Sequence, residues 1–537
     1  MKVQLLGAGV VLSLVAVAGV LQAPAAAGPR AEPERELPLG APGLSETRTT
    51  TTLQPGVTLT RIVRGAEAPA LPWTVEVSIP GGETSPDPDA PPTALKDRAS
   101  ADELVGRLRR DGFEARAERV VTPAVADYRG GTLGWRVRVG TFAARSGADA
   151  ERSRLTGAGY AGSALYTGWD GDAQDRGPWR VDVLTVDPRR FRGSLDASYG
   201  TDLERRERTS ELADAGGALA AVNGGFFVLD PRSGAPGDPA GTGVYRGRTL
   251  SEPVGGRPVL MTDAGGRSRV VRTVWSGRVV GRDAALPLDG VNRVPGLVRN
   301  CGGTADDTPT GRPLHDVTCQ DPDELVAFTA DFGPRTPAGE GVEAVLDARG
   351  RVVELRSARG GVLPDGGSSV QATGEQADRL ARLARVGERL RVEEGLRDER
   401  GRVLAASPST SVVNGGPELV RDGRPHVTPA ADGMVHADNP SFYYGWMHKR
   451  NPRTLAGTDA AGRTVLITAD GRDTDALGLS IPESAAVARS LGLRDAVNLD
   501  GGGSTAMVVN GELITDPSDA AGERPVGDAL LIRPHRD

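Results

Sequence analysis

Two aspartates that follow apolar runs and one arginine carry the reactive side-chain types of this sequence. Asp500 follows the run A-V-N-L and precedes three glycines, and Asp470 follows V-L-I-T-A. Arg453 comes directly after a proline in N-P-R-T, so a stiffened backbone carries a guanidinium that can hold phosphate or carboxylate bidentately. This set suits hydrolysis at an anionic centre, with either aspartate as nucleophile or as the base that activates water. The alternative is a structural Arg–Asp pair.

A recurring pattern supplies candidate substrate-binding groups. An apolar run, an asparagine and a nearby glycine pair occur three times in the chain. Each instance alone is typical of a turn, but together they predict amides that converge on a polyhydroxylated ligand, with glycines that leave room for it. The candidates are Asn223, Gly224, Gly225, Asn414, Gly415, Gly416, Asn498, Gly501, Gly502, Gly503 and Ser504, with Glu252 as a further carboxylate.

The surrounding sequence predicts the elements that position these groups. Ser480, Ile481, Pro482 and Glu483 form a capping box that starts a helix over 481–491. A strand over 496–499 then leads to Asp500, and Asn-Gly inside 507–514 predicts a hairpin. The run 179–186 alternates as a strand, and 375–386 has the spacing of an amphipathic helix whose arginines form a solvated face.

The N-terminal third reads as strand, helix, strand, twice over. The first copy has a strand at 73–79 and a helix at 101–110, and the second has a strand at 135–142 and a helix near 148–156. This order is the ferredoxin-like arrangement. The W-R-V-R-V-G-T-F and L-x-x-x-G-Y elements resemble a SPOR-type repeat domain, which we place at 63–168. The resemblance implies peptidoglycan as a partner, and the alternative is an accessory domain with no ligand of its own.

The N-terminus indicates export. Residues 1–27 combine Lys2, an apolar stretch and small residues before a predicted cleavage site, which is typical of a signal peptide; an uncleaved membrane anchor is the alternative. Residues 28–62 are rich in Pro, Glu and Thr and predict a disordered tether. In an exported chain, the two cysteines, Cys301 and Cys319, predict one disulfide, with His315 solvated in the loop between them.

Composition excludes several function classes. The net charge of −7 over 537 residues gives no basic footprint, so we predict no nucleic-acid partner. The acidic segment that starts at Asp470, D-G-R-D-T-D, lacks the glycine and glutamate spacing of a calcium loop, and the histidines lack the spacing of zinc ligands. We therefore predict no metal or other cofactor. A divalent ion is an alternative without support. The cluster S-F-Y-Y-G-W-M predicts core packing or an aromatic platform for a sugar near Arg453.

The motifs N-G-G-F-F, N-G-G-P, N-P-R-T, T-A-D-G-R and N-L-D-G-G-G-S-T, taken in order, resemble the phosphodiester glycosidase family. The resemblance covers 179–537, with 263–358 as a probable insertion. It implies a strand-rich α+β domain with few helices that hydrolyses a sugar-1-phosphodiester, with Arg453 at the departing phosphate.

The resulting hypothesis is an exported or wall-associated hydrolase with a sugar-phosphate glycan as substrate. The rival is a cell-wall glycan-binding protein without turnover. The sequence ranks neither the sugar nor the aglycone, and it does not assign which aspartate is nucleophile or base.

Overall fold

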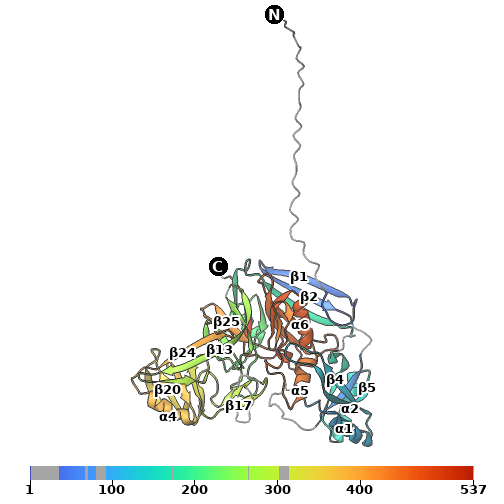
Figure 1. Ribbon diagram of the computed structural model, residues 1–537, viewed down its shortest axis with the longest axis horizontal. Coiled ribbons are helices and arrows are strands. Elements are labelled where there is room, and N and C mark those ends of the chain that lie inside the picture. Colours follow the sequence, from blue (N-terminus) through green and yellow to red (C-terminus); the bar gives the residue numbers. More distant parts are fainter. Residues whose placement is uncertain are drawn as a thin grey trace. The chain divides into compact units, whose positions relative to one another are not determined.

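The computed structural model is strand-rich, with few helices (Figure 1). It describes Met1 and residues 36–66, 71–79, 92–171, 175–263, 265–301 and 314–535. The predicted signal peptide, apart from Met1, lies outside the described residues, as does the first part of the predicted tether. No helix among the described residues is long and apolar enough to span a membrane. The α+β class predicted from the sequence is confirmed.

The central element is an eight-stranded sheet that is buried on both faces. Along β7, Val181 and Val183 join one hydrophobic cluster while Leu184 and Val186 join another, as the two-residue period of a strand requires. The strands in spatial order are β1 (Glu46–Gln54), β2 (Val57–Arg64), β7 (Trp179–Val186), β29 (Thr464–Ala469), β28 (Arg453–Asp459), β30 (Leu493–Asn498), β26 (Glu418–Arg421) and β27 (Arg424–Pro425).

The prediction of a disordered tether over 28–62 is wrong for its second half. Strands β1 and β2 form a hairpin, and β2 pairs with the whole of β7. Val57, Leu59 and Ile62 are buried. The threonine run looked like a polar tether, but β-branched threonines favour extended backbone and suit an edge strand with one exposed face.

Two more antiparallel sheets complete the cores around this one. A five-stranded sheet packs over the second cluster and contains β32 (Glu512–Leu513), β31 (Met507–Val509), β9 (Ala220–Asn223), β33 (Ala529–Pro534) and β8 (Gly193–Ser198), with α3 (Thr209–Gly216) beside it. The other contains β11 (Arg248–Ser251), β10 (Gly243–Tyr245), β25 (Thr410–Asn414), β12 (Pro258–Asp263), β13 (Ser268–Val280), β14 (Ala285–Leu288) and β24 (Arg391–Asp398).

The predicted ferredoxin-like arrangement is confirmed. The elements run β3 (Trp73–Val77), α1 (Arg98–Arg110), β4 (Ala115–Thr122), β5 (Gly131–Phe142), α2 (Arg145–Gly157) and β6 (Gly162–Tyr166), with sheet order β4-β5-β3-β6. A 3₁₀ turn, η1 (Thr167–Asp170), leads out of it.

This N-terminal unit shares its core with the rest of the chain. Trp73 and Leu104 belong to the same hydrophobic cluster as Trp179 and Phe442. Ser441 exchanges hydrogen bonds with the main chain of Leu95 at 2.9 and 3.2 Å. The two parts therefore bury apolar surface against each other.

Residues within the predicted insertion 263–358 form part of a lobe with its own core. The sheet consists of β15 (Gly290–Val291), β18 (Leu325–Thr329), β23 (Ser368–Ala372), β20 (Val342–Leu346) and β21 (Val352–Arg356), and α4 (Gly374–Leu383) packs on it. Because Leu380 and Leu390 belong to this core, the lobe extends beyond 358. Two small ladders, β16 (Leu297–Arg299) with β17 (Thr318–Gln320) and β19 (Thr336–Gly339) with β22 (Arg359–Gly361), lie beside it.

Several local predictions agree closely with the structure. Helix α6 (Ile481–Ser490) begins with the predicted capping box at Ser480, and β31 and β32 form the predicted hairpin, with Asn510 and Gly511 at positive φ. Cys301 and Cys319 form the predicted disulfide. Residues 440–448 form a short helix, α5 (Pro440–Tyr443), that continues into one π-helical turn, η2 (Tyr444–His448).

Candidate functional site

A cavity of about 310 Å³ lies where β28 begins and β30 ends. The two strands pair antiparallel, so the start of one meets the end of the other. Polar groups of both charges face the cavity. Its lining residues are Glu76, Pro92, Ala94, Tyr444, Gly445, Trp446, Lys449, Asn451, Arg453, Arg472, Asp500, Gly501 and Gly502.

Arg453 is a buried cation in the wall of this cavity, 1% exposed. Its Nε donates to the carbonyl of Leu479 at 2.9 Å, and Nη2 donates to the carbonyl of Trp446 at 2.6 Å. No carboxylate among the described residues forms an ion pair with it, so the alternative of a structural Arg–Asp pair is not observed. Burial, together with the charge of Arg472, lowers the pKa of Arg453 to about 9. The guanidinium remains charged at neutral pH and lacks a counter-ion within the described protein.

Asp500 lies just after β30 and lines the same cavity. A Cβ on the next residue, Gly501, would lie 3.7 Å from the Cα of Arg453. The main chain of Asp500 is fixed on both sides, because its N–H donates to the carbonyl of Gly224 at 3.2 Å and its own carbonyl accepts from Asn223 at 2.8 Å. One carboxylate oxygen accepts from the N–H of Gly501 at 2.9 Å. Gly502 has φ +60°, and a side chain there would press on Arg472. The loop thus holds a carboxylate and places Gly502 beside a second arginine.

Asp500 also lines a second, smaller cavity of about 40 Å³, together with Ser504, His315 and Trp446. The Ser504 hydroxyl is buried and has no hydrogen-bond partner among the described residues. Asp500 therefore lies between the two spaces and is accessible from both.

The prediction that His315 is solvated is wrong. Its ring is 2% exposed and lies edge-on to Phe226 and Trp446, with ring centroids 4.4 and 5.0 Å away. Arg257 Nη1 lies 3.0 Å from Nδ1. A guanidinium only donates, so Nδ1 accepts and the ring proton lies on Nε2. Burial lowers the pKa of His315 well below its usual value, so the ring is neutral at pH 7.

His315 Nε2 is buried and has no hydrogen-bond partner among the described residues. It is therefore an unused N–H donor on a ring that lines the same small cavity as Asp500. No local sequence pattern predicts this position, because Arg257 and Phe226, which hold the ring, lie far from His315 along the chain.

Asp470 is not among the residues that line either cavity. It ends β29, where its carboxylate accepts from the N–H of Asp516 at 3.2 Å. Burial, with the nearby charges of Asp182 and Asp516, raises the pKa of Asp470 to about 7. Asp470 thus lies outside both cavities, although it follows β29, whose last residue pairs with Arg453.

The three asparagines do converge, but their amides bind main-chain groups and the Thr454 hydroxyl, and none of the three lines either cavity. Asn223 accepts from Thr454 at 2.6 Å and donates to Asp500. Asn414 exchanges two hydrogen bonds with the backbone of Phe226, and Asn498 donates to the carbonyl of Gly416 at 3.0 Å. They fasten the loops at the ends of β9, β25 and β30 to one another.

The glycine pairs beside them serve the same packing. A Cβ at Gly224 would lie 2.3 Å from Asp528, one at Gly225 2.7 Å from Asn414, and one at Gly415 2.7 Å from the Asn498 carbonyl. Gly416 has φ +139°, and Gly503 is packed against Arg524. Of the predicted loop residues, Gly501 and Gly502 line the larger cavity and Ser504 lines the smaller.

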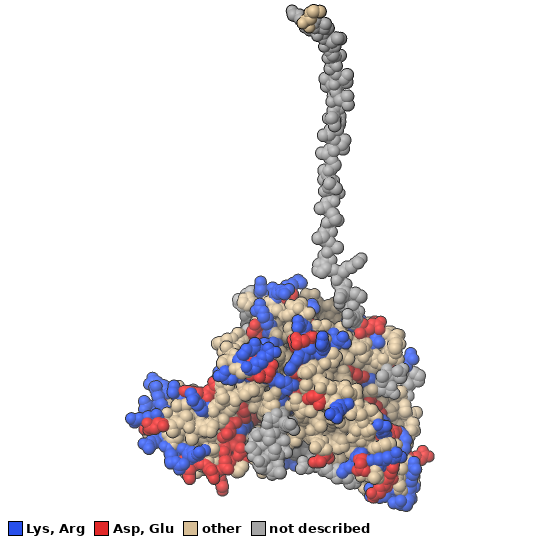
Figure 2. All heavy atoms as spheres, in the orientation of Figure 1, with Lys and Arg blue, Asp and Glu red and all other residues tan. Residues whose placement is uncertain are grey.

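Glu252 lies elsewhere, in an ion pair with Arg293 at 2.5 Å and a hydrogen bond from the N–H of Val291 at 2.9 Å. It lines neither of the cavities beside Asp500. Across the described residues there is no group of three or more His, Cys, Asp or Glu side chains arranged to hold a metal ion. On the face shown in Figure 2, basic and acidic side chains are interspersed rather than gathered by sign.

The cavity also contains residues to which the sequence assigned no role. Lys449 and Glu76 line it, and Arg472 lies beside Gly502 with Nε donating to Asn451 at 3.2 Å. Tyr444 and Trp446, from the aromatic cluster, both pack in the fold and face the cavity. Glu76 comes from β3, and no local pattern indicated that this strand reaches the site.

Comparison with known proteins identifies two regions. Residues 340–533 match the phosphodiester glycosidase family, and 93–166 match the SPOR domain. A segment of 114 residues is 32% identical to the N-acetylglucosamine-1-phosphodiester alpha-N-acetylglucosaminidase of Mus musculus. That segment covers 21% of this chain and 22% of the mouse protein, so only about a fifth of the curated relative is matched.

Solved structures are similar over much more of the chain. A candidate exported protein of Burkholderia pseudomallei is 34% identical, with a TM-score of 0.81 over 94% of this chain and 99% of that one. A hypothetical protein from Synechocystis, 16% identical, has a TM-score of 0.52 over 91% of this chain and 76% of that one, which is a similarity of fold alone. Arg453 and Asp500 lie inside the matched region 340–533, whereas His315 and Glu76 lie outside it.

Proposed function

Because the chain belongs to the phosphodiester glycosidase family and carries a SPOR domain ahead of its glycosidase domain, we propose that it is an exported hydrolase of a sugar-1-phosphodiester. It would cleave the bond between the anomeric carbon and the phosphate oxygen in a cell-envelope or extracellular glycan. Water enters at the sugar, and the products are the free sugar and a phosphomonoester. The N-terminal signal sequence, the SPOR domain and the exported relative support action at the cell wall.

The observation that carries this proposal is that Arg453 and Asp500 line the same cavity. Arg453 is buried, charged and without a carboxylate counter-ion in the described chain, which is a costly state unless an anion binds there. Arg472 adds a second guanidinium to the same cavity. A phosphate at Arg453 would compensate the charge of that guanidinium, with Arg472 as a further donor, and Asp500 would then face the sugar side of the scissile bond.

The chemistry follows from the leaving group. A phosphate departs readily as an anion, so stabilising its charge matters more than donating a full proton to it. Arg453 and Arg472 would bind that charge as it develops. Asp500 would act at the anomeric carbon, either as the attacking group or as the base for water. The neutral His315 would donate a hydrogen bond from Nε2 to the substrate beside Asp500.

Asp470 has a different place in this proposal from that predicted from the sequence. It was a candidate for nucleophile or base, but it lines neither cavity, so we assign it no contact with the substrate. Glu252 is likewise assigned to its ion pair with Arg293. The proposed reacting groups are therefore Asp500, Arg453, Arg472 and His315.

The test is hydrolysis of sugar-1-phosphodiesters, in both anomers, by the mature protein and its Asp500→Asn variant. We expect turnover by the wild type and a loss of about 1,000-fold or more in the variant. Asp495→Asn, the same change within β30 ahead of Asp500 and outside the cavities, serves as the control. Parallel assays with a chelator test metal dependence directly.

No turnover on any substrate, with saturable binding of wall glycan, would support the rival hypothesis of a glycan-binding protein. Turnover that persists in Asp500→Asn would overturn the assignment of Asp500. Release of phosphomonoester with ¹⁸O from labelled water in the sugar, and not in the phosphate, would establish which bond breaks.

A further inference from the structure

The wall of the larger cavity opposite β28 and β30 comes from the SPOR region and its neighbouring segment. Glu76 of β3, Pro92 and Ala94 line the cavity together with Tyr444 and Lys449 of the glycosidase domain. A SPOR domain that served only as a tether would not need to reach the catalytic cavity. Strand β3 reaches the cavity through the side chain of Glu76.

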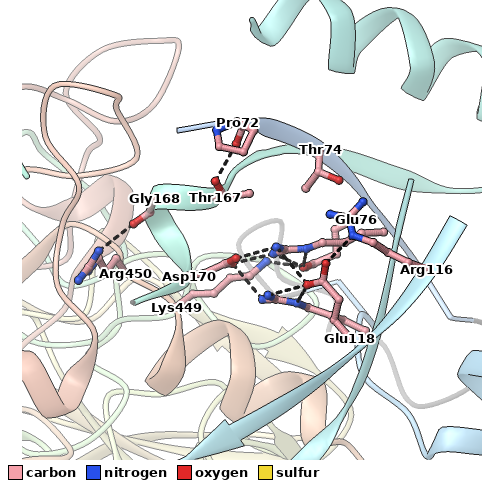
Figure 3. A network of polar contacts seen from close by, with 12 residues as sticks. Pro72, Thr74, Glu76, Arg116, Glu118, Thr167, Gly168, Asp170, Lys449 and Arg450 are labelled. Carbon is pink, nitrogen blue, oxygen red and sulfur yellow. Dashed lines mark hydrogen bonds and ion pairs between the residues drawn. The ribbon is translucent and has the colours of Figure 1, made fainter. Parts of the chain in front are cut away.

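This wall is held by a closed network of charged groups (Figure 3). Glu76 Oε1 accepts from Lys449 Nζ at 2.5 Å, and Oε2 accepts from the Tyr444 hydroxyl at 2.8 Å and from Arg138 at 3.0 Å. Arg138 also donates to both carboxylate oxygens of Asp170 at 2.6 Å. These hydrogen bonds join the SPOR strands to one another, to η1 and to residues 444–449.

This network contains four cations and three carboxylates. Arg136, Arg138 and Lys449 are paired with Glu76, Glu118 and Asp170, and Glu118 also pairs with Arg116. Burial alone would raise the pKa of Glu76, but the charges of Lys449, Arg138 and Arg136 lower it to about 2. Glu76 is therefore an ionised carboxylate, fixed in direction, at the edge of a cavity whose opposite wall is cationic.

Both members of the Glu76–Lys449 pair retain hydrogen-bonding capacity. A carboxylate oxygen has two acceptor sites, and Oε1 uses one for Lys449. The ammonium has three N–H groups, of which one goes to Glu76, and the nitrogen lies 4.6 Å from the centroid of the Tyr444 ring. Donor, acceptor, aromatic ring and the apolar surface of Pro92 and Ala94 together suit a sugar unit with hydroxyl or acetamido groups.

The same segment fixes the proposed phosphate-binding group. The carbonyls of Trp446 and Lys449 both accept hydrogen bonds from Arg453 Nη2, at 2.6 and 3.4 Å. Residues 444–449 thus contact Arg453 through their main chain and Glu76 through their side chains. A ligand on the phosphate site that extends along this segment reaches the SPOR wall.

From these contacts we propose that the SPOR domain forms a second subsite of the catalytic cavity, in which Glu76 and Lys449 bind the unit beyond the scissile phosphodiester. The substrate is then a phosphodiester-linked glycan chain rather than a small sugar phosphodiester, and Glu76 determines this specificity. The inference rests on the proposed hydrolytic function, because it assigns the two sides of one substrate to the two walls of one cavity.

The experiment compares two substrates: a sugar-1-phosphodiester with a methyl aglycone, and a phosphodiester-linked oligomer of several sugar units. The variants are Glu76→Gln and Lys449→Gln, of which either suffices if the other does not fold. The control is Glu118→Gln, which removes a carboxylate from the same network in the same domain but lines neither cavity. Thermal melting of each variant reports whether it is folded.

We expect the wild type to prefer the oligomer, and Glu76→Gln to lower kcat/KM for the oligomer about tenfold more than for the methyl substrate. That ratio corresponds to about 1.4 kcal/mol, the size of one charged hydrogen bond. Glu118→Gln should leave the ratio of the two substrates as in the wild type.

Equal losses on both substrates, or the same change of ratio in Glu118→Gln, would overturn the subsite and leave the wall with a structural role only. Wild-type turnover of the methyl substrate tests the hydrolytic function independently. If the wild type cleaves neither substrate, the function proposed above has failed, whereas cleavage without an oligomer preference contradicts only the subsite.

Discussion

At the scale of single residues, the unusual group is a guanidinium buried among carbonyls. Arg453 makes its hydrogen bonds to Leu479 and Trp446, both neutral acceptors. Each satisfies a donor but neither supplies a negative charge, and for that reason burial depresses the pKa of Arg453 to about 9. By contrast Arg450, equally buried, is paired with Asp175 and Glu483. The charge of Arg450 is therefore balanced within the fold, whereas for Arg453 we propose an anionic ligand.

Replacement of Arg453 by Ala is expected to lower kcat for a phosphodiester about 100- to 1,000-fold, the loss typical of a group that stabilises developing charge. Inorganic phosphate should raise the Tm of the wild type, because it binds only the folded state, but not that of the variant. Arg463→Ala, an exposed arginine at the other end of the β28–β29 hairpin, is the control. A phosphate-induced shift that is undiminished in Arg453→Ala would refute its role as the anion site.

Burial has the opposite effect on the pKa of Asp470, which it raises. Its raised pKa of about 7 means that the folded protein holds a proton there after the unfolded chain has lost it. Between about pH 4 and pH 7 the unfolded state binds fewer protons, so the free energy of unfolding falls as pH rises. The contribution is fully present below the unfolded pKa and is lost as the pH passes the folded pKa.

The variant Asp470→Asn should remove this pH dependence. A pKa change from 3.8 to about 7 corresponds to roughly 4 kcal/mol as an upper limit, so the variant should gain up to that amount relative to the wild type at pH 8 and little at pH 4. Urea unfolding across this pH range measures the difference. Activity should be retained, since Asp470 lines neither cavity; a loss of turnover as large as that of Asp500→Asn would restore Asp470 to the catalytic set.

At the scale of elements, the site is made of loops at strand ends. Sequence periodicity located β7, α6, β30 and the β31–β32 hairpin because each signal is local: alternation, a capping box, an Asn-Gly turn. Because these signals are local, they predict less of the site than of the fold. Arg453 and Asp500 are predicted site residues that do line the cavity. The sequence also predicts the asparagines as ligand groups, because it cannot show that Asn223 bonds to Thr454 and the Asp500 carbonyl.

Groups that enter the cavity from distant segments could not be predicted. His315 was placed in a solvated loop since its partners Arg257 and Phe226 are remote in sequence. Glu76 belongs to a strand whose own pattern only indicates a sheet. The 28–62 segment was misread for a related reason, because a threonine-rich strand with one exposed face resembles a tether until its partner β7 is known.

The disulfide Cys301–Cys319 closes the segment that carries His315. Replacing both cysteines by serine is expected to lower the free energy of unfolding by about 3 kcal/mol, the entropy of a loop of this length. If the disulfide also holds His315 beside Asp500, kcat should fall by at least tenfold under conditions where the variant is still folded. A variant that is less stable but fully active at low temperature would show that Arg257 and the aromatic rings fix His315 without it.

At the scale of the whole molecule, the SPOR region and the glycosidase domain form one compact unit in the described residues from Glu36 onward. A single hydrophobic cluster runs through both. Tyr128 of the SPOR region stacks on Tyr443 with ring centroids 4.8 Å apart, and Asp127 accepts from the main-chain N–H groups of Ala430 and Ala431. Independent modules joined by a linker would show neither a shared core nor a shared cavity wall.

This arrangement predicts that the intact protein unfolds in one calorimetric transition, with the calorimetric enthalpy equal to the van't Hoff enthalpy. Tyr443→Ala, which removes buried aromatic surface between the two parts, should lower the Tm of that single transition rather than split it, by an amount that reflects roughly 3–5 kcal/mol. Two separate transitions in the wild type would contradict a common core. They would also weaken the case for the SPOR wall, since a domain that unfolds alone could not hold Glu76 at the cavity up to the temperature at which the glycosidase domain itself melts.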